Sequence, residues 1–137
     1  MWVGNSVAMI KEDYLLRIIQ ELGRKIAELV ERRTHGKTDE GIVLASALFR
    51  EYAGGDCEDV AFEIDEEVVG EWSAQQTDMM ADAAFETALM YWESGDSERA
   101  DNFKRIALNL YKEAERKDQT YSYVREEKKE QIHTIIN

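Results

Sequence analysis

No proline occurs in this chain of 137 residues, and that absence constrains its fold more than any other single feature. Proline marks turns and sheet edges, because its ring fixes φ and its nitrogen has no hydrogen to donate. A proline-free chain rich in alanine, glutamate, leucine and arginine favours helices joined by short turns. With 44% apolar residues, a chain of this length can bury one core. We therefore expect an all-α protein with a single domain.

Apolar side chains recur at helical spacing along most of the chain. The first helix is expected from Val7 to about Arg33, and Gly36 can end it in a left-handed conformation. Capping residues predict later helices that begin at Thr38 or Asp39, after Ser73, at Asp96 or Ser97, and after a break at residues 118–122. The sequence thus predicts five to six helices, arranged as a bundle or a hairpin array.

The same spacing predicts which side of each helix faces the core. In the first helix the inward side chains include Tyr14, Leu15, Leu22 and Leu29. In the last helix they are Val124, Ile132, Ile135 and Ile136.

Residues 56–70 allow two interpretations. Asp56 can cap a helix whose inward side is formed by Cys57, Val60, Ile64 and Val68, while residues 60–65 alternate as a strand would. We prefer a short helix, because a lone strand would have no partner to pair with in this sequence.

Charge divides the chain into three parts. Between Glu51 and Glu98 there are fifteen acidic side chains and no lysine or arginine. The residues before this stretch sum to +1 and those after it to +2, which gives the net charge of −12. The distribution has two explanations: the ends fold back onto the acidic middle, or the middle presents an acidic face to a cationic partner.

Few side chains suit catalysis or metal binding. Glu130 and His133 have the spacing of one half of a carboxylate-bridged two-metal site, but two histidines cannot complete the site. An EF-hand loop starting at Asp56 would place Ala61 where glycine is required. Cys57 is the only cysteine, and we interpret it as a small buried residue. We expect no enzyme activity, no cofactor and no metal site.

Nucleic acid and membranes are poor candidates for a partner. Arginines along the first helix are interleaved with glutamates, and the net charge of −12 would repel phosphate. No stretch of about 18 apolar residues is present, and the start of the chain lacks the pattern of a secretory signal. A single cysteine fits a reducing compartment, so we expect a cytoplasmic location.

Residues 84–107 resemble one tetratricopeptide unit, which is a pair of antiparallel helices. The positions that carry the resemblance are Tyr91, the Gly95-Asp96 turn, Ala100 and Ala107. The first helix lacks the tryptophan and the Leu-Gly pair of that unit, and no clear second copy follows about 34 residues away. The resemblance implies one tetratricopeptide-like helix pair.

Both ends of the chain resemble a small bacterial family of unknown function. The opening pattern D-Y-x-x-R-x-I occurs as residues 13–19, and residues 118–122 followed by a charged helix resemble the end of that family. The resemblance implies a helical fold and a bacterial, cytoplasmic origin, and it supplies no activity. It also implies a start at Met9, so that residues 1–8 are an N-terminal extension that can be disordered and residues 9–137 form the domain.

The function expected from these features is non-enzymatic protein binding. A partner protein or peptide with a basic segment would dock on the acidic middle, through Glu63, Glu66, Glu67, Glu71, Tyr91 and Trp92. A core position is the stronger alternative for Trp92. Two other functions stay open: a structural homodimer paired through the first helix and the Ile132–Ile136 end, and a metal-dependent enzyme that uses the acidic cluster.

Overall fold

The computed structural model describes the backbone of residues 2–136 and the side chains of residues 11–136. The chain forms six helices and, within these residues, no strand, which confirms the all-α prediction. The helices are α1 (Trp2–Thr34), α2 (Thr38–Ala53), α3 (Glu66–Glu71), α4 (Ala74–Glu93), α5 (Ser97–Asp118) and α6 (Tyr123–Ile135). The predicted extension at residues 1–8 lies outside the described side chains.

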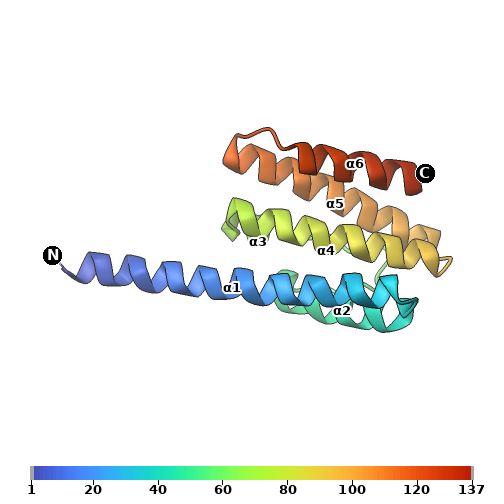
Figure 1. The fold of residues 1–137 in the computed structure, drawn as a ribbon, viewed down its shortest axis with the longest axis horizontal. Helices are drawn as coiled ribbons and strands as arrows, with labels where there is room; N and C mark the ends of the chain where they lie inside the picture. The colour runs from blue at the N-terminus through green and yellow to red at the C-terminus, as the bar shows by residue number, and fades with distance from the viewer. Residues whose placement is uncertain (1, 137) are drawn as a thin grey trace.

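The long helices form an array of hairpins (Figure 1). α1 and α2 make one antiparallel pair, α4 and α5 make a second, and α6 runs back along α5. α4 lies at the centre, because it contacts α1 and α2 on one side and α5 and α6 on the other. The helix pair predicted at residues 84–107 lies in the α4–α5 hairpin, and the two helices predicted on either side of Gly36 form a second hairpin, α1–α2.

Local side-chain caps fix the start of α4, α5 and α6, as their sequences predict. The Ser73 hydroxyl accepts a hydrogen bond from the Gln76 amide at 3.1 Å, and the Asp96 carboxylate accepts one from the Arg99 amide at 3.1 Å. Ser122 does the same for α6. Lys37 precedes α2 without a side-chain cap, so the prediction of Thr38 or Asp39 at that position is wrong by one or two residues.

An aromatic cluster joins four parts of the chain around Phe103 of α5. Ring centroids of Phe49, Phe62 and Tyr91 lie 5.2, 5.8 and 5.9 Å from that of Phe103. These rings come from α2, the segment before α3, and α4. Such aromatic pairs contribute about 0.5–1.5 kcal/mol each beyond their buried area. The cluster therefore holds the segment between α2 and α3 against the hairpins.

That segment differs from the prediction. Residues 54–65 form a loop, neither helix nor strand, and only Glu66–Glu71 are helical. The Asp56 carboxylate accepts a hydrogen bond from the Glu58 amide at 3.0 Å, and Asp59 accepts one from Ala61 at 2.9 Å. Aspartate side chains that bind the amide two residues on stabilise turns at the expense of a helix.

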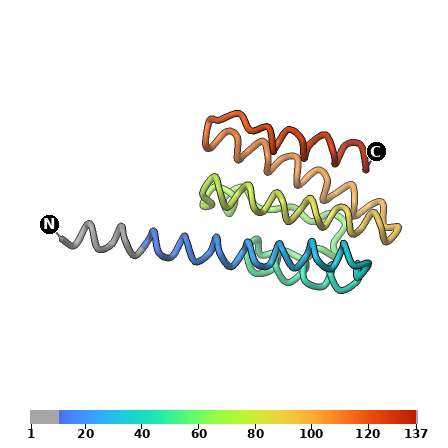
Figure 2. The backbone as a smooth tube through the Cα atoms, viewed as in Figure 1, coloured from blue at the N-terminus to red at the C-terminus, as the bar shows by residue number. Residues whose placement is uncertain are grey.

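Two of the predicted inward faces are partly wrong. Tyr14 and Leu15 are exposed, because this part of α1 extends beyond the other helices (Figure 2). In α6 the buried line runs through Arg125 and Ile132 and continues to Ile136, so Val124 and Ile135 lie on the exposed side. The prediction placed only apolar residues on the buried side of α6. In the structure that side includes Arg125, so it is turned away from Val124 and Ile135.

Gly55 packs directly against the aromatic cluster. A Cβ atom at this position would lie 1.7 Å from the Phe62 ring. The ring is 5% exposed and cannot move without disturbing Phe49 and Phe103. Glycine is therefore required here by close packing.

We expect Gly55→Ala to lower the free energy of unfolding by about 1–3 kcal/mol, because the added methyl group overpacks the core. Gly70→Ala is the control, since nothing lies within 4 Å of its added Cβ. Urea unfolding of both variants measures the difference. Equal stability of the two variants would contradict this account of the loop.

Candidate functional site

Acidic side chains of α4 are bound by cations of α6. Arg125 is 6% exposed, and its Nε lies 2.9 Å from Asp78 Oδ1 while its Nη2 binds Asp118 at the end of α5. Lys128 Nζ lies 2.6 Å from Asp82 Oδ1. One face of α6 is thus held on α4 and α5 by ion pairs as well as by Ile132.

Two further acidic side chains of α4 are bound by α1. Arg33 Nε donates to Glu86 Oε2 at 2.6 Å, and its Nη1 lies 3.5 Å from Glu93 Oε1. Glu86 is buried, so this pair is screened less by solvent than a surface pair. Within the α1–α2 hairpin, Lys25 of α1 pairs with Glu51 of α2. The basic ends of the chain therefore fold back onto the acidic middle, the first of the two explanations of the charge pattern.

Lys117 fixes the connection between α3 and α4. Its Nζ donates to the Val69 and Trp72 carbonyls at 2.5 and 2.8 Å and to Thr77 Oγ1 at 2.9 Å. Burial lowers the pKa of this ammonium group, and the three oxygen acceptors satisfy its donors. The short helix α3 is thereby attached to α5 at a defined position.

The acidic loop, which we define as residues 56–71, uses its charge differently. Its three aspartates accept backbone hydrogen bonds, and Asp65 caps α3 by binding the Glu67 amide at 2.9 Å. Its glutamates form no ion pair or side-chain hydrogen bond within the described residues; they are Glu58, Glu63, Glu66, Glu67 and Glu71. The aspartates therefore stabilise the backbone of the loop, and the glutamates are exposed to solvent.

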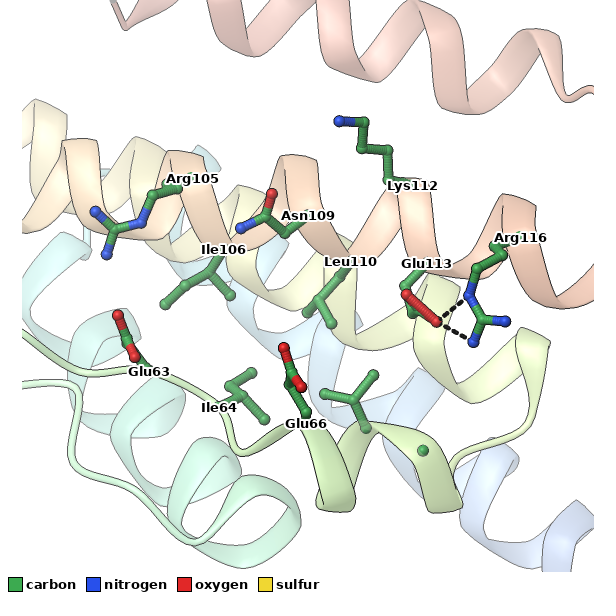
Figure 3. A pocket seen from close by; sticks show the side chains of 12 residues that line it. Glu63, Ile64, Glu66, Arg105, Ile106, Asn109, Leu110, Lys112, Glu113 and Arg116 are labelled. Atoms are coloured by element: carbon green, nitrogen blue, oxygen red, sulfur yellow. Dashed lines mark hydrogen bonds and ion pairs between the residues drawn. The ribbon is translucent and has the colours of Figure 1, made fainter.

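A groove of about 750 Å³ lies between the acidic loop and α5 (Figure 3). Ile64 and Val69 line it from the loop side, and Ile106 and Leu110 line it from α5. Ile106 and Leu110 are 7% and 4% exposed, so they belong to the core as well as to the groove. The floor of this groove is apolar.

The two rims of the groove carry opposite charge. Glu63 and Glu66 form the rim on the loop side, and basic residues of α5 form the other. Arg105 donates to Asn102 and Arg116 pairs with Glu113, whereas Lys112 has no ion pair among the described residues. The basic rim was not predicted, although Arg105, Lys112 and Arg116 share one face of a helix by their spacing.

The predicted partner-binding residues do not form one surface. Glu63 and Glu66 line the groove, while Glu67 and Glu71 are exposed on α3 outside the groove lining. Tyr91 is only 5% exposed, and its hydroxyl donates to the Cys57 carbonyl at 3.3 Å, so this ring lies in the core. Trp92 is 40% exposed, near the C-terminal end of α4, and is not a core residue.

The remaining candidate residues lie apart from the groove. Burial raises the pKa of the Cys57 thiol to about 12, which leaves it a poor nucleophile near neutral pH. In the described part of the chain, no three side chains of the metal-binding types gather around a common point. No helix there has both the length and the apolar character to cross a membrane.

Comparisons with known proteins add no further information on function. No protein-family model matches the chain, and neither a curated protein nor a solved structure shows significant similarity to it. The bacterial family suggested by the two ends of the chain stays a prediction.

The Arg125–Asp118 pair predicts how stability depends on pH. Hydrogen bonds from Arg125 and then from Thr120 hold the pKa of Asp118 below its usual 3.8. The unfolded chain therefore binds a proton at Asp118 at a higher pH than the folded protein does. The stabilisation is complete above about pH 5 and is lost as the pH falls through and below 3.8.

We expect Asp118→Asn to flatten the loss of stability between about pH 4.5 and pH 2.5, since one linked proton is removed. Asp101→Asn serves as the control, because Asp101 is exposed and forms no ion pair in the described structure. Urea unfolding at several pH values measures the slope. A slope that is unchanged in Asp118→Asn, or equally changed in both variants, would contradict the assignment.

Proposed function

We propose that this protein is a non-enzymatic binding module that holds a basic segment of a partner protein in the groove between the acidic loop and α5. The observation that carries the proposal is the position of Glu63 and Glu66, two glutamates without an ion pair in the described structure, beside an apolar floor. An acidic chain with a free acidic rim attracts cationic segments before contact. We also propose a bacterial, cytoplasmic setting.

The groove offers two kinds of interaction to a bound segment. Ile64, Val69, Ile106 and Leu110 can bury an apolar side chain, which supplies affinity in proportion to the area removed from water. The charged rims supply orientation, because a lysine or arginine of the partner is favoured at the glutamate rim and disfavoured at the α5 rim. A segment with an apolar residue next to a basic one fits both features.

The size of the groove limits the length of the bound segment. From Arg105 to Arg116 the basic rim extends about 16 Å along α5, at 1.5 Å per residue. An extended chain covers that distance in about five residues. A contact of this size, confined to one groove, is typical of short-motif recognition, as distinct from the docking of two large domains.

The proposal is tested first by finding which peptides the groove selects. Purified wild-type protein is used as bait for a display library of random peptides. We expect enriched peptides with an apolar residue beside lysine or arginine, because that pair matches the floor and the glutamate rim. No enrichment, or enrichment of acidic peptides, would refute the proposal.

A charge-matched pair of variants then locates the binding surface. We expect Glu63→Gln with Glu66→Gln to weaken the best peptide by about tenfold, or about 1.4 kcal/mol, in isothermal titration calorimetry. Glu127→Gln with Glu130→Gln removes the same charge from exposed positions of α6 and should change affinity by less than about twofold. Equal weakening by both pairs would mean non-specific attraction.

A further inference from the structure

Arg105 of α5 is an exposed arginine that a buried side chain holds in place. It lines the groove, and its guanidinium group donates a hydrogen bond to Asn102 Oδ1. Asn102 is 5% exposed, and its Nδ2 donates to the Phe62 carbonyl at 3.0 Å. Because Phe62 belongs to the aromatic cluster, a chain of hydrogen bonds connects the core to this guanidinium group. Arg105 is therefore held at a defined position on the groove rim.

The contact with Asn102 leaves the charge of Arg105 free. The Asn102 amide can serve both neighbours in one orientation only, since the carbonyl needs a donor and the guanidinium group needs an acceptor. Within the described residues, Arg105 forms no ion pair with a carboxylate. Arginine binds carboxylates through two parallel hydrogen bonds, so a guanidinium group fixed in this way is ready to receive one.

The other arginines with described side chains fall into two groups. The first group binds carboxylates of its own chain; it consists of Arg32, Arg33, Arg99, Arg116 and Arg125. The second group forms no ion pair or side-chain hydrogen bond in the described structure; it consists of Arg17, Arg24 and Arg50. Among these described side chains, only Arg105 is both held by a buried neutral group and without a carboxylate partner.

A glutamate lies across the groove from Arg105. Figure 3 shows Glu63 and Arg105 on opposite sides of the groove at the same end, beside Ile64 and Ile106. The two charged groups do not pair with each other in the described structure. A bound segment with a cation at Glu63 and a carboxylate at Arg105 would give both groups a partner.

We propose that the groove binds an internal segment of a partner protein that carries an acidic side chain in addition to its basic and apolar ones, and that Arg105 receives the acidic side chain. This inference rests on the function proposed above and adds to it the acidic residue and the group that binds it. Asn102 is a positioning residue, because it is buried beneath the rim and acts through Arg105. All three side chains of the partner lie within the segment of about five residues that the groove accommodates.

The charge near Arg105 favours a carboxylate over a phosphate group. A phosphorylated side chain carries about −1.5 to −2 charges at pH 7. Glu63, Glu66 and Glu113 also line the groove, and they would repel such a group more strongly than the single charge of a carboxylate. Aspartate or glutamate is therefore the residue that fits this end of the groove.

The peptides selected from the display library give the first test. Enriched sequences should contain aspartate or glutamate within about five residues of the lysine or arginine. Enrichment of basic and apolar peptides without an acidic residue would overturn this inference and would still support the proposed function. No enrichment at all would refute the proposed function, and this inference with it.

Two synthetic peptides then test the contact with Arg105. One is the most enriched sequence with both ends capped, so that no terminal carboxylate can bind, and the other replaces its acidic residue with the matching amide. On the wild type we expect the amide peptide to bind about tenfold more weakly in isothermal titration calorimetry. On Arg105→Gln the two peptides should bind equally, because the group that distinguishes them is absent.

Two further variants complete the comparison. Arg24→Gln removes the same charge from an exposed position of α1 and should keep the tenfold difference between the peptides. Asn102→Ala should reduce that difference and change the affinity for the amide peptide by less than about twofold, whereas a merely structural role would weaken both peptides equally. Circular dichroism verifies that each variant folds, and Arg105→Gln decides the question if Asn102→Ala does not fold.

Either of two results overturns the proposal. One is an amide peptide that binds the wild type as tightly as the acidic peptide does. The other is a tenfold difference between the peptides that persists in Arg105→Gln.

Discussion

The fold depends on a set of ion pairs that α4 makes with helices from both ends of the chain. Glu86 binds Arg33 of α1, Asp78 binds Arg125 of α6, and Asp82 binds Lys128 of α6. Because these carboxylates recur at every fourth residue, they lie along one side of a central helix whose other sides are packed with alanine, methionine and phenylalanine. Partly buried charges of this kind are costly when one partner is absent, so they specify which helices pack on α4.

The acidic middle of the chain has two parts: in the described structure, the carboxylates of α4 and Asp96 form ion pairs, and the glutamates of the acidic loop do not. Every acidic side chain from Asp78 to Asp96 has a cationic partner, whereas the glutamates of the acidic loop have none within the described residues. Lys117 and Phe62 hold that loop beside α5 from opposite ends. The unpaired glutamates of this loop are thus held at a defined position beside the apolar groove.

The sequence predicted features that depend on residues close together in the chain, and it missed features that depend on contacts between distant residues. Caps such as Ser73 and Asp96 bind amides three residues away, so helix starts could be predicted from local sequence. The pairing of Arg33 with Glu86 spans 53 residues, and the packing of Phe62 on Phe103 is also long-range. Periodicity carries no information about such contacts. The sequence therefore predicted an acidic face from charge alone, and it missed the groove and the basic rim on α5.

Comparing the stability of two charge-neutralised variants is the most direct measurement of the central claim. Asp78→Asn with Glu86→Gln should lower the free energy of unfolding in urea by at least about 2 kcal/mol, because Arg125 and Arg33 each lose one of their two carboxylate partners. Glu63→Gln with Glu66→Gln removes the same charge from the groove rim and should not lower it, since no ion pair is lost in the described structure and repulsion is reduced. Equal losses, or a larger loss in the rim variant, would contradict the division of the acidic side chains.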